Sequence, residues 1–346
     1  MHMHESDWVA LAPKRNAESL RRHLRSRGLM DIRRKITVRD DLVLIPVVTN
    51  DVQDLNEFDA EIRHQIGMAE LTARIAPFGL IAESVDLEPS LKPFLPRKWE
   101  RVGDVLILKL PPELKELRSV VAEAYANVLG ASAVLQDIAG IAGDWRLPGV
   151  EKIWGGSTET THLEGGVLFR LDAAKVMFSS GNSPERMKMG RVSRREETVV
   201  DMFAGIGYFT IPMAVHSRPK RIFACEVNPV AFRYLEDNIR INRVENVEPL
   251  LGDCRVTAPE GVADRIVMGY LRGQDYLDKA FRVLKPEGTI HYHEACPNEL
   301  VESRPWSAVR LAARKAGRRV QLLQLRHLKS YAPGVSHVVA DAKITP

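Results

Sequence analysis

The chain has 346 residues, 45% hydrophobic and 27% charged, which is the composition of an ordinary globular protein with room for two or three domains. Its three cysteines are too few and too scattered for a disulfide framework, which indicates a reducing compartment. The start MHMHESDW lacks the apolar stretch of a signal peptide, and no apolar run reaches the roughly 20 residues that span a bilayer. We therefore expect a cytoplasmic protein without membrane contact.

Positive charge is concentrated in residues 14–39, which contain ten Lys and Arg residues against two acidic ones. The net charge of the whole chain is only +4, so the remaining residues are net negative. A cluster of arginines is typical of a surface that binds a polyanion, because guanidinium groups bind phosphate in a bidentate manner. A solvated helix face is the alternative. The candidate phosphate-binding residues are Arg21, Arg22, Arg25, Arg34 and Lys35.

Residues 1–48 are expected to form a small basic α/β module. Asn16 is placed to cap a helix, and Gly28 is placed to end it. The segment KITVRDDLVLIPVV (35–48) predicts two strands. Residues 49–100 are first acidic and poorly patterned and then punctuated by prolines, which is typical of a linker.

Residues 101–195 are expected to form a mixed α/β module that contributes to the binding site, with a strand over 103–110 and a helix over 113–129. Residues 196–346 alternate apolar strands with helices, which predicts a parallel sheet covered on both faces. The last two strand-like segments follow one another without a helix and predict an antiparallel hairpin at the sheet edge. The expected fold is therefore α/β, a doubly wound Rossmann-like sheet of the class I methyltransferase type preceded by smaller modules.

The motif DMFAGIGYFTIP (201–212) carries the chemistry of this last domain. It begins at Asp201 on the first strand and turns tightly through Gly205 and Gly207, where the absence of side chains lets the backbone approach a ligand. This loop lies where doubly wound sheets bind ligands. A nicotinamide fingerprint would require a third glycine at the position of Thr210, so the motif does not favour a dehydrogenase.

Acidic residues end the next two strands. Glu226 follows Asp201 by 25 residues and is placed to accept hydrogen bonds from both hydroxyls of a ribose. Asp253 is placed to accept a hydrogen bond from an adenine amino group. The alternative for both is that they cap the following helices. Together with the glycine loop, they favour an adenosine-containing cofactor, and the missing third glycine favours S-adenosylmethionine.

The chain resembles the archaeal and eukaryotic enzymes that modify tRNA beside the anticodon. The resemblance covers essentially the whole chain and is strongest in DMFAGIGYFTIP, LPRKWERVGDV (95–105), AKVMFSSGNSPERMKMGR (174–191) and SYAPGVSHVVADAKI (330–344). Two activities occur in this superfamily: the guanine-37 N1-methyltransferase and the wybutosine-pathway aminocarboxypropyltransferase. The resemblance implies S-adenosylmethionine as the donor and tRNA as the acceptor. It also implies that the basic N-terminal module helps to bind the tRNA at a region distant from the anticodon.

Three departures from the methyltransferase pattern favour the transferase. An Asn-x-Pro pattern after the fourth strand is replaced by MGYL (268–271), and a Phe-Ser-Pro-Arg-type loop by FSSGN (178–182). The fifth strand ends in HYHE (291–294), which is similar to the transferases. The resemblance thus implies transfer of the 3-amino-3-carboxypropyl group to carbon 7 of 4-demethylwyosine at position 37 of tRNA(Phe). Guanine-37 N1-methylation and a non-catalytic RNA-binding role with a relict cofactor loop remain alternatives.

The resemblance also implies roles for individual residues. Ser179 and Arg186 would hold the methionine end of S-adenosylmethionine, because a guanidinium forks onto a carboxylate. Glu226 would bind the ribose, and Asp253 with the backbone of Cys254 would bind the adenine. A surface position is the alternative for Arg186.

No catalytic base is assigned, although Glu294 is a candidate acceptor for the carbon-7 proton. A structural carboxylate at the end of a strand is the alternative for this residue. His291 and His293 share one face of their strand, but no further ligand cluster accompanies them, so no metal is expected. No protein partner is required by any of these patterns.

Overall fold

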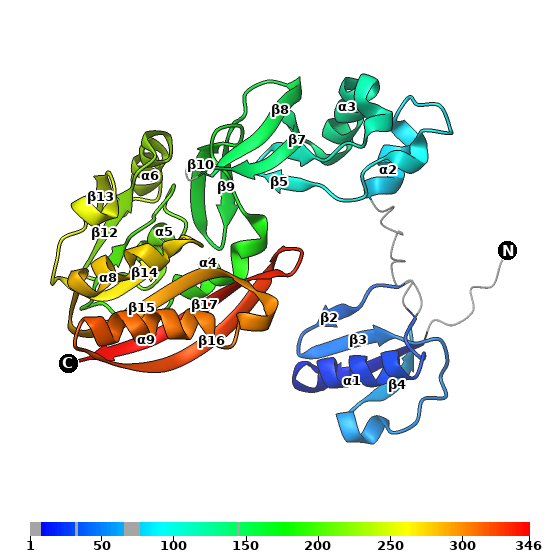
Figure 1. Cartoon of the computed structure of the whole chain (residues 1–346). Coiled ribbons are helices and arrows are strands. Elements are labelled where there is room, and N and C mark those ends of the chain that lie inside the picture. The colour runs from blue at the N-terminus through cyan, green and yellow to red at the C-terminus, as the bar shows by residue number, and fades with distance from the viewer. Residues whose placement is uncertain (1–7, 32–33, 66–76, 144–145) are drawn as a thin grey trace. The chain divides into compact units, whose positions relative to one another are not determined.

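The computed structural model describes residues 8–31, 34–65, 77–143 and 146–346 (Figure 1). The chain divides into two compact units, Met1–Glu83 and Ser84–Pro346. Within the described residues, no helix is both long and apolar enough to cross a membrane.

The first unit contains a four-stranded antiparallel sheet packed against one helix. The strands lie in the order β2-β3-β1-β4. The elements are β1 (Trp8–Pro13), α1 (Lys14–Ser26), β2 (Thr37–Arg39), β3 (Leu42–Pro46), the 3₁₀ turn η1 (Leu55–Phe58) and β4 (Glu61–His64). The helix buries Leu20 and Leu24 against the sheet because they lie one turn apart on its apolar face.

Both strands expected over 35–48 are present, and Gly28 follows the helix with a left-handed φ of 68°. The expected cap is wrong. The helix starts at Lys14, so Asn16 lies inside its first turn and donates a hydrogen bond to the Phe58 carbonyl oxygen at 3.0 Å. This contact shows that residues beyond 48 belong to the same unit.

Strand β4 carries this unit well past the boundary expected at residue 48. It pairs with β1 in register from Trp8↔His64 to Leu11↔Glu61. An acidic residue of the expected linker also has a structural partner, because Asp59 binds Arg15 at 3.0 Å. The segment 49–100 is therefore not one extended linker: η1, β4 and helix α2 (Pro77–Ser84) all lie within it.

The second unit starts with a small mixed sheet in the order β5-β6-β7-β8. Its elements are β5 (Glu100–Val102), β6 (Val105–Leu108), the turn η3 (Pro112–Leu117), α3 (Arg118–Leu129), β7 (Ala133–Ala142) and β8 (Leu147–Gly155). Strands β6 and β7 are parallel and are joined through α3, whereas the other pairs are antiparallel. The expected strand over 103–110 and helix over 113–129 match β6 and the η3–α3 pair.

A hairpin joins this module to the large sheet. It consists of β9 (Glu159–Glu164) and β10 (Val167–Asp172) and packs on helix α6 (Pro229–Ile241). The side chains of Asn238 on α6 and of Asn242, which caps its C-terminus, bond to backbone groups of Arg170 and Leu168, respectively. The boundary expected at residue 195 is consequently no break, because residues on both sides of it share one hydrophobic cluster.

The large sheet has seven strands in the order β13-β12-β11-β14-β15-β17-β16. Five are parallel: β11 (Thr198–Asp201), β12 (Arg221–Glu226), β13 (Val247–Leu251), β14 (Ala263–Met268) and β15 (Leu284–Pro297). The edge hairpin, β16 (Arg319–Ala332) with β17 (Val335–Thr345), is antiparallel. The expected fold of the class I methyltransferase type is thereby confirmed.

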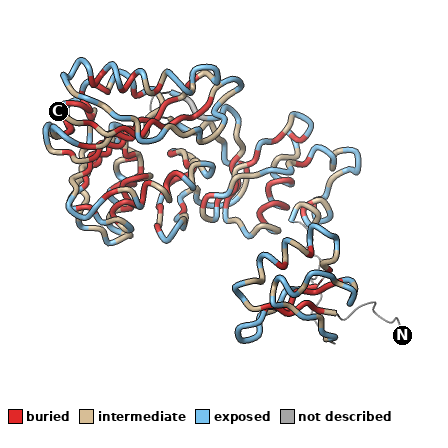
Figure 2. Tube along the Cα trace, turned by 90° about the horizontal axis from the view of Figure 1, so that it is seen from below, coloured by how far each residue is buried: buried red, intermediate tan, exposed pale blue. Residues whose placement is uncertain are grey.

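Helices cover both faces of this sheet, and the buried residues follow its strands (Figure 2). They are α4 (Ser183–Met189), α5 (Thr210–His216), α6, α7 (Cys254–Thr257), α8 (Leu277–Val283) and α9 (Arg304–Lys315). The strand order reverses between β11 and β14, and such a switch point leaves a crevice at the carboxyl ends of the strands. This crevice holds the candidate site.

Candidate active site

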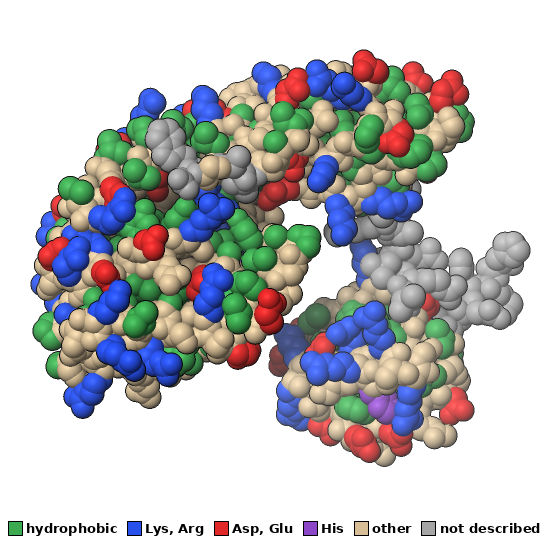
Figure 3. All heavy atoms as spheres, in the orientation of Figure 1, with side chains coloured by type: hydrophobic (Ala, Val, Ile, Leu, Met, Phe, Trp, Pro, Cys, Tyr) green, Lys and Arg blue, Asp and Glu red, His purple; other side chains and the backbone are tan. Residues whose placement is uncertain are grey.

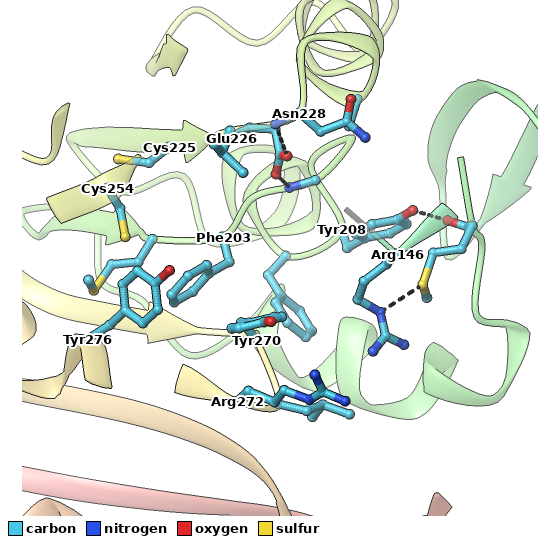
Figure 4. A pocket seen from close by; sticks show the side chains of 18 of the residues that line it. Arg146, Phe203, Tyr208, Cys225, Glu226, Asn228, Cys254, Tyr270, Arg272 and Tyr276 are labelled. Carbon is cyan, nitrogen blue, oxygen red and sulfur yellow. Dashed lines mark hydrogen bonds between the residues drawn. The ribbon is translucent and has the colours of Figure 1, made fainter. Parts of the chain in front are cut away.

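A cavity of about 530 Å³ lies at the carboxyl ends of β11, β12, β13 and β14 (Figure 4). Its volume is in the range of small-molecule sites. The cavity brings together six residues that the sequence analysis selected from separate segments: Ser179, Arg186, Gly205, Glu226, Asp253 and Cys254. Glu294, which belongs to the described part of the same unit, does not line it.

The glycine loop forms the floor next to β11. Gly205 and Gly207 have φ values of 58° and 98°, which side chains rarely adopt. A Cβ on Gly207 would also lie 2.5 Å from Cγ1 of Ile211, so alanine cannot be accommodated without a shift. Asp201 is fully buried and accepts hydrogen bonds from the Phe203 amide at 3.2 Å and the Thr210 hydroxyl at 2.8 Å. Burial raises the pKa of Asp201 to about 6.

Glu226 is held in place by the loop that it faces. Its two carboxylate oxygens accept hydrogen bonds from the Gly205 amide at 2.8 Å and the Asn228 amide at 2.7 Å (Figure 4). Burial raises the pKa of this carboxyl group, and the amide hydrogen bonds oppose that shift. Each oxygen keeps a further lone pair. The carboxylate is thus already oriented to accept hydrogen bonds from ribose hydroxyls.

Asp253 has a structural partner at the end of β13. Its carboxylate caps α7 through the Arg255 amide at 2.8 Å and also binds the Arg255 guanidinium, which lowers its pKa. Helix capping was the alternative interpretation for this residue, and the carboxylate does cap α7. The Arg255 guanidinium lies 4.8 Å from the Tyr276 ring centre. Beside them, burial raises the pKa of the Cys254 thiol, which gives a neutral wall.

Arg186 is not a surface arginine, because only 2% of it is exposed. Its Nε and Nη2 bind the two carboxylate oxygens of Glu164 on β9 at 2.6 and 2.7 Å, and its Nη1 donates to the Ser179 carbonyl oxygen at 2.8 Å. The Phe178 ring centre lies 4.5 Å from the guanidinium carbon. Ser179 in turn accepts a hydrogen bond on Oγ from Lys329 at 2.8 Å. Arg186 therefore fixes the loop that carries Ser179.

Glu294 lies away from the cavity, so the structure does not support it as the base. Only 2% of it is exposed, and Arg304 at the start of α9 donates to its carboxylate from Nε at 2.5 Å. Alternation along β15 places it on the same face as Tyr292, which packs in the core beneath α8 and α9. The alternative, a structural carboxylate at a strand end, describes its environment.

Several cavity residues were not predicted from the sequence. Phe203 packs against Tyr270 and Tyr276, with ring centres 5.3 and 4.9 Å apart (Figure 4). Arg146 enters from the β7–β8 connection and donates to the Met177 sulfur at 3.2 Å. MGYL (268–271) was selected only for what it lacks, although its Tyr270 lines the cavity.

His337 is a further unpredicted residue of the cavity wall. It comes from β17 and pairs with His293 on β15, with Nε2 of His337 3.0 Å from Nδ1 of His293. On the far side of His293, its Nε2 lies 4.0 Å from Oε1 of Glu185. Burial lowers the pKa of both histidines to about 3. Both rings are therefore neutral near pH 7.

The basic candidates of the first unit have different environments. Arg34 is buried, binds Asp31 at 3.0 Å and donates to the carbonyl oxygens of Trp8 and Val47, so it holds the fold and is not available to phosphate. Arg21 and Arg22 share the exposed carboxylate of Glu18. Arg25 and Lys35 are exposed. Figure 3 shows Lys and Arg side chains, mixed with acidic ones, over the visible face of this unit.

Comparison with known proteins identifies the family. Residues 160–323 match the TRM5/TYW2 methyltransferase domain, 83–158 the TYW2 N-terminal domain and 12–54 the tRNA methyltransferase 5 N-terminal domain. The tRNA(Phe) (4-demethylwyosine(37)-C(7)) aminocarboxypropyltransferase of Methanocaldococcus jannaschii is 44% identical over 71% of this chain and 97% of its own. The chain belongs to the TRM5/TYW2 family.

A methyltransferase and a solved transferase structure are also similar to this chain. The tRNA (guanine(37)-N(1))-methyltransferase Trm5b of Pyrococcus abyssi is 33% identical over 96% of this chain and 98% of its own. The crystal structure of M. jannaschii TYW2 in complex with AdoMet superposes with a TM-score of 0.60 and covers 72% of this chain and 99% of that one. The two sequences are 40% identical. The predicted family, fold and S-adenosylmethionine dependence are confirmed.

The described residues fit S-adenosylmethionine. Gly205 lines the cavity with backbone atoms, and the oriented Glu226 carboxylate suits a ribose. The buried thiols of Cys225 and Cys254 and the ring of Tyr276 give an apolar wall suited to adenine. The Ser179 loop forms the remaining wall, next to Arg186.

We expect Glu226→Ala to weaken S-adenosylmethionine binding by about 1–3 kcal/mol, because ribose hydroxyls would lose a charged acceptor. Titration calorimetry measures this loss. Glu248→Ala is the matched control, since Glu248 lies on the neighbouring strand β13 in an exposed ion pair with Arg221. Equal affinities for the two variants would remove Glu226 from the site.

The histidine pair predicts a pH dependence of stability. In the unfolded chain these histidines bind protons below about pH 6.5, whereas in the folded chain they stay neutral down to about pH 3. Between these pH values protonation favours the unfolded chain, so the two histidines reduce the stability of the fold as the pH falls. Asp201, with its raised pKa, acts in the opposite direction. We therefore compare His337→Gln with the wild type in denaturant titrations between pH 6 and 4. The variant should lose less stability, by up to about 1.4 kcal/mol per pH unit, and parallel curves would contradict this.

Proposed function

We propose that this chain transfers the 3-amino-3-carboxypropyl group of S-adenosylmethionine to carbon 7 of 4-demethylwyosine at position 37 of tRNA(Phe), in wybutosine biosynthesis. The observation that carries the proposal is the 44% identity to a relative named for this reaction, over 97% of its length. The cavity wall supports it, because MGYL (268–271) stands where the methyltransferase pattern has Asn-x-Pro.

When bound, S-adenosylmethionine supplies a sulfonium with three attackable carbons, and its orientation decides which of them meets the acceptor. The chain sets this orientation from two ends. Glu226 and the glycine loop hold the ribose, and the Ser179 loop, fixed by Arg186 and Lys329, holds the methionine arm. Fixing both ends can direct the γ-carbon towards the base and the methyl group away from it, since placement alone is worth several kcal/mol of barrier.

Guanine-37 N1-methylation is the second candidate, and one observation favours it. The P. abyssi Trm5b relative matches 96% of this chain, including the first unit, whereas the aminocarboxypropyltransferase of M. jannaschii matches 71%. The higher identity to the transferase, 44% against 33%, favours aminocarboxypropyl transfer. The first unit is compatible with either reaction.

Differential labelling separates the two candidates. The chain is incubated with tRNA(Phe) carrying 4-demethylwyosine and with S-adenosylmethionine labelled either in the methyl or in the carboxyl group. We expect only the carboxyl label to enter the tRNA, with methylthioadenosine as the co-product. Entry of the methyl label into tRNA with a guanine at position 37, with S-adenosylhomocysteine as the co-product, would instead support methylation.

We also propose that the first unit contributes tRNA binding through phosphate contacts. The support is the exposed basic residues Arg25 and Lys35, together with Arg21 and Arg22, whose shared carboxylate on Glu18 is itself exposed. The family match of residues 12–54 to the tRNA methyltransferase 5 N-terminal domain adds to it. Such contacts release counterions, so they are sequence-tolerant and steeply salt-dependent.

A truncated chain of residues 77–346 tests this proposal. The cut falls beyond β4, because ending the deletion at residue 48 would separate β4 from its sheet. We expect weaker tRNA binding with a flatter salt dependence, unchanged S-adenosylmethionine affinity and the same transferred group. Filter binding at several salt concentrations measures this, and an identical tRNA affinity and salt slope would show that the second unit binds tRNA unaided.

A further inference from the structure

His337 combines three properties that a purely structural histidine does not need. It lines the cavity, only 3% of it is exposed, and within the described part of the chain its Nδ1 has no hydrogen-bond partner. Within the same described residues, Nε2 of His293 also has no hydrogen-bond partner, and it lies 4.0 Å from Oε1 of Glu185. Buried nitrogens without partners cost stability and are rare in folded proteins. The pair therefore has unused hydrogen-bonding capacity at both of its ends.

A neighbouring histidine provides the contrast. His291 lies on the same face of β15, two residues before His293, and both of its ring nitrogens are satisfied, by Asp341 at 2.7 Å and by Arg265 at 2.7 Å. The strand can therefore bury a histidine with complete hydrogen bonding. At His337, a residue that lines the cavity, the same sheet leaves Nδ1 buried and without a partner.

The proposed reaction needs such a group. Carbon 7 carries a hydrogen, and this proton must leave when the new carbon–carbon bond forms. Two carboxylates of the cavity are engaged, Glu226 by two backbone amides and Asp253 by Arg255. Outside the cavity, Glu294 binds Arg304 through Oε1, and its buried Oε2 has no partner among the described residues. Asp275 also lines the cavity, but it is exposed, so water competes for its oxygens.

We propose that Nδ1 of His337 accepts the carbon-7 proton, and that His293 and Glu185 stabilise the resulting charge. This inference rests on the proposed aminocarboxypropyl transfer. Carbon 7 attacks the γ-carbon of the methionine arm, the carbon–sulfur bond breaks and its electron pair stays on sulfur. The carbon–hydrogen pair then restores the aromatic ring of the base, and the proton goes to Nδ1 of His337.

The surroundings of the pair are suited to a proton acceptor that is neutral at rest. Burial holds the pKa of His337 low, and His293, Lys329 on β16 and Arg146 on the β7–β8 connection also disfavour a charge on its ring. Glu185 on α4 opposes them through His293. Its carboxylate is fixed by the Arg326 guanidinium and lies 4.0 Å from Nε2 of His293. A proton donated along the His337–His293 hydrogen bond thus moves the charge towards a carboxylate.

His337→Gln in the full-length chain tests the proposal. Glutamine can keep the hydrogen bond to Nδ1 of His293 but has no group at the position of Nδ1 of His337. We expect the single-turnover rate with tRNA(Phe) carrying 4-demethylwyosine to fall by about 10²–10⁴-fold, the range for loss of a general base, with S-adenosylmethionine affinity unchanged. Deuterium at carbon 7 should slow the variant more than the wild type, because proton removal becomes limiting.

Further variants cover the other outcomes. If His337→Gln does not fold, His337→Ala is assayed with added imidazole, and restoration of transfer by imidazole would support the proposal. Asp275→Asn tests the rival acceptor in the cavity wall, and its loss of rate should be smaller than that of His337→Gln. A wild-type rate for His337→Gln, or a large loss confined to Asp275→Asn, would overturn the assignment. If the wild-type chain itself transfers no carboxyl label to the tRNA, the proposed function is wrong, and the role of His337 in that reaction is wrong as well.

Discussion

The buried guanidinium of Arg186 holds together segments that the cavity needs and that are distant in the sequence. It joins Glu164 on β9, the Ser179 carbonyl and the Phe178 ring through three hydrogen bonds and one stacking contact. A buried charge is tolerated only when it is paired and hydrogen-bonded, and this guanidinium meets that condition. Because the Ser179 loop forms one wall of the cavity, the geometry of this wall depends on the Arg186–Glu164 pair.

The opposite side of the cavity is built mainly from backbone groups. Glu226 reaches across from β12 to the Gly205 amide, and Asp201 ties the end of β11 to the first turn of α5. The Tyr208 hydroxyl links this wall to the other one, because it donates to the Met177 carbonyl oxygen two residues before Ser179.

Patterns that are local in the sequence predicted most of the fold. The alternation of apolar strands with helices gave the doubly wound sheet, and the two final strand segments without a helix gave its edge hairpin, both of which are confirmed. The glycine loop and Glu226 could be found because each lies at a strand end with a fixed spacing. The N-terminal boundary was placed too early because β4 contributes only four residues, in an acidic segment without clear alternation.

Side-chain partners could not be predicted in the same way, because they depend on the register between distant strands. Glu164 lies 22 residues before Arg186, and His337 lies 44 residues after His293, so no spacing rule connects either pair. Arg34 looked like its exposed neighbours in a basic run, yet its position beside Trp8 and Val47 buries it. Its burial follows from the closing of the small sheet and not from local composition.

The central claim is that the two walls direct the γ-carbon of the methionine arm, and not the methyl group, towards the acceptor base. A crystal structure of the full-length chain with S-adenosylmethionine and a tRNA(Phe) anticodon arm carrying 4-demethylwyosine measures this directly. The account predicts that the γ-carbon lies in line between sulfur and carbon 7, with the ribose on Glu226 and the arm along the Ser179 loop. A methyl group placed between sulfur and the base, with the γ-carbon turned away, would contradict it.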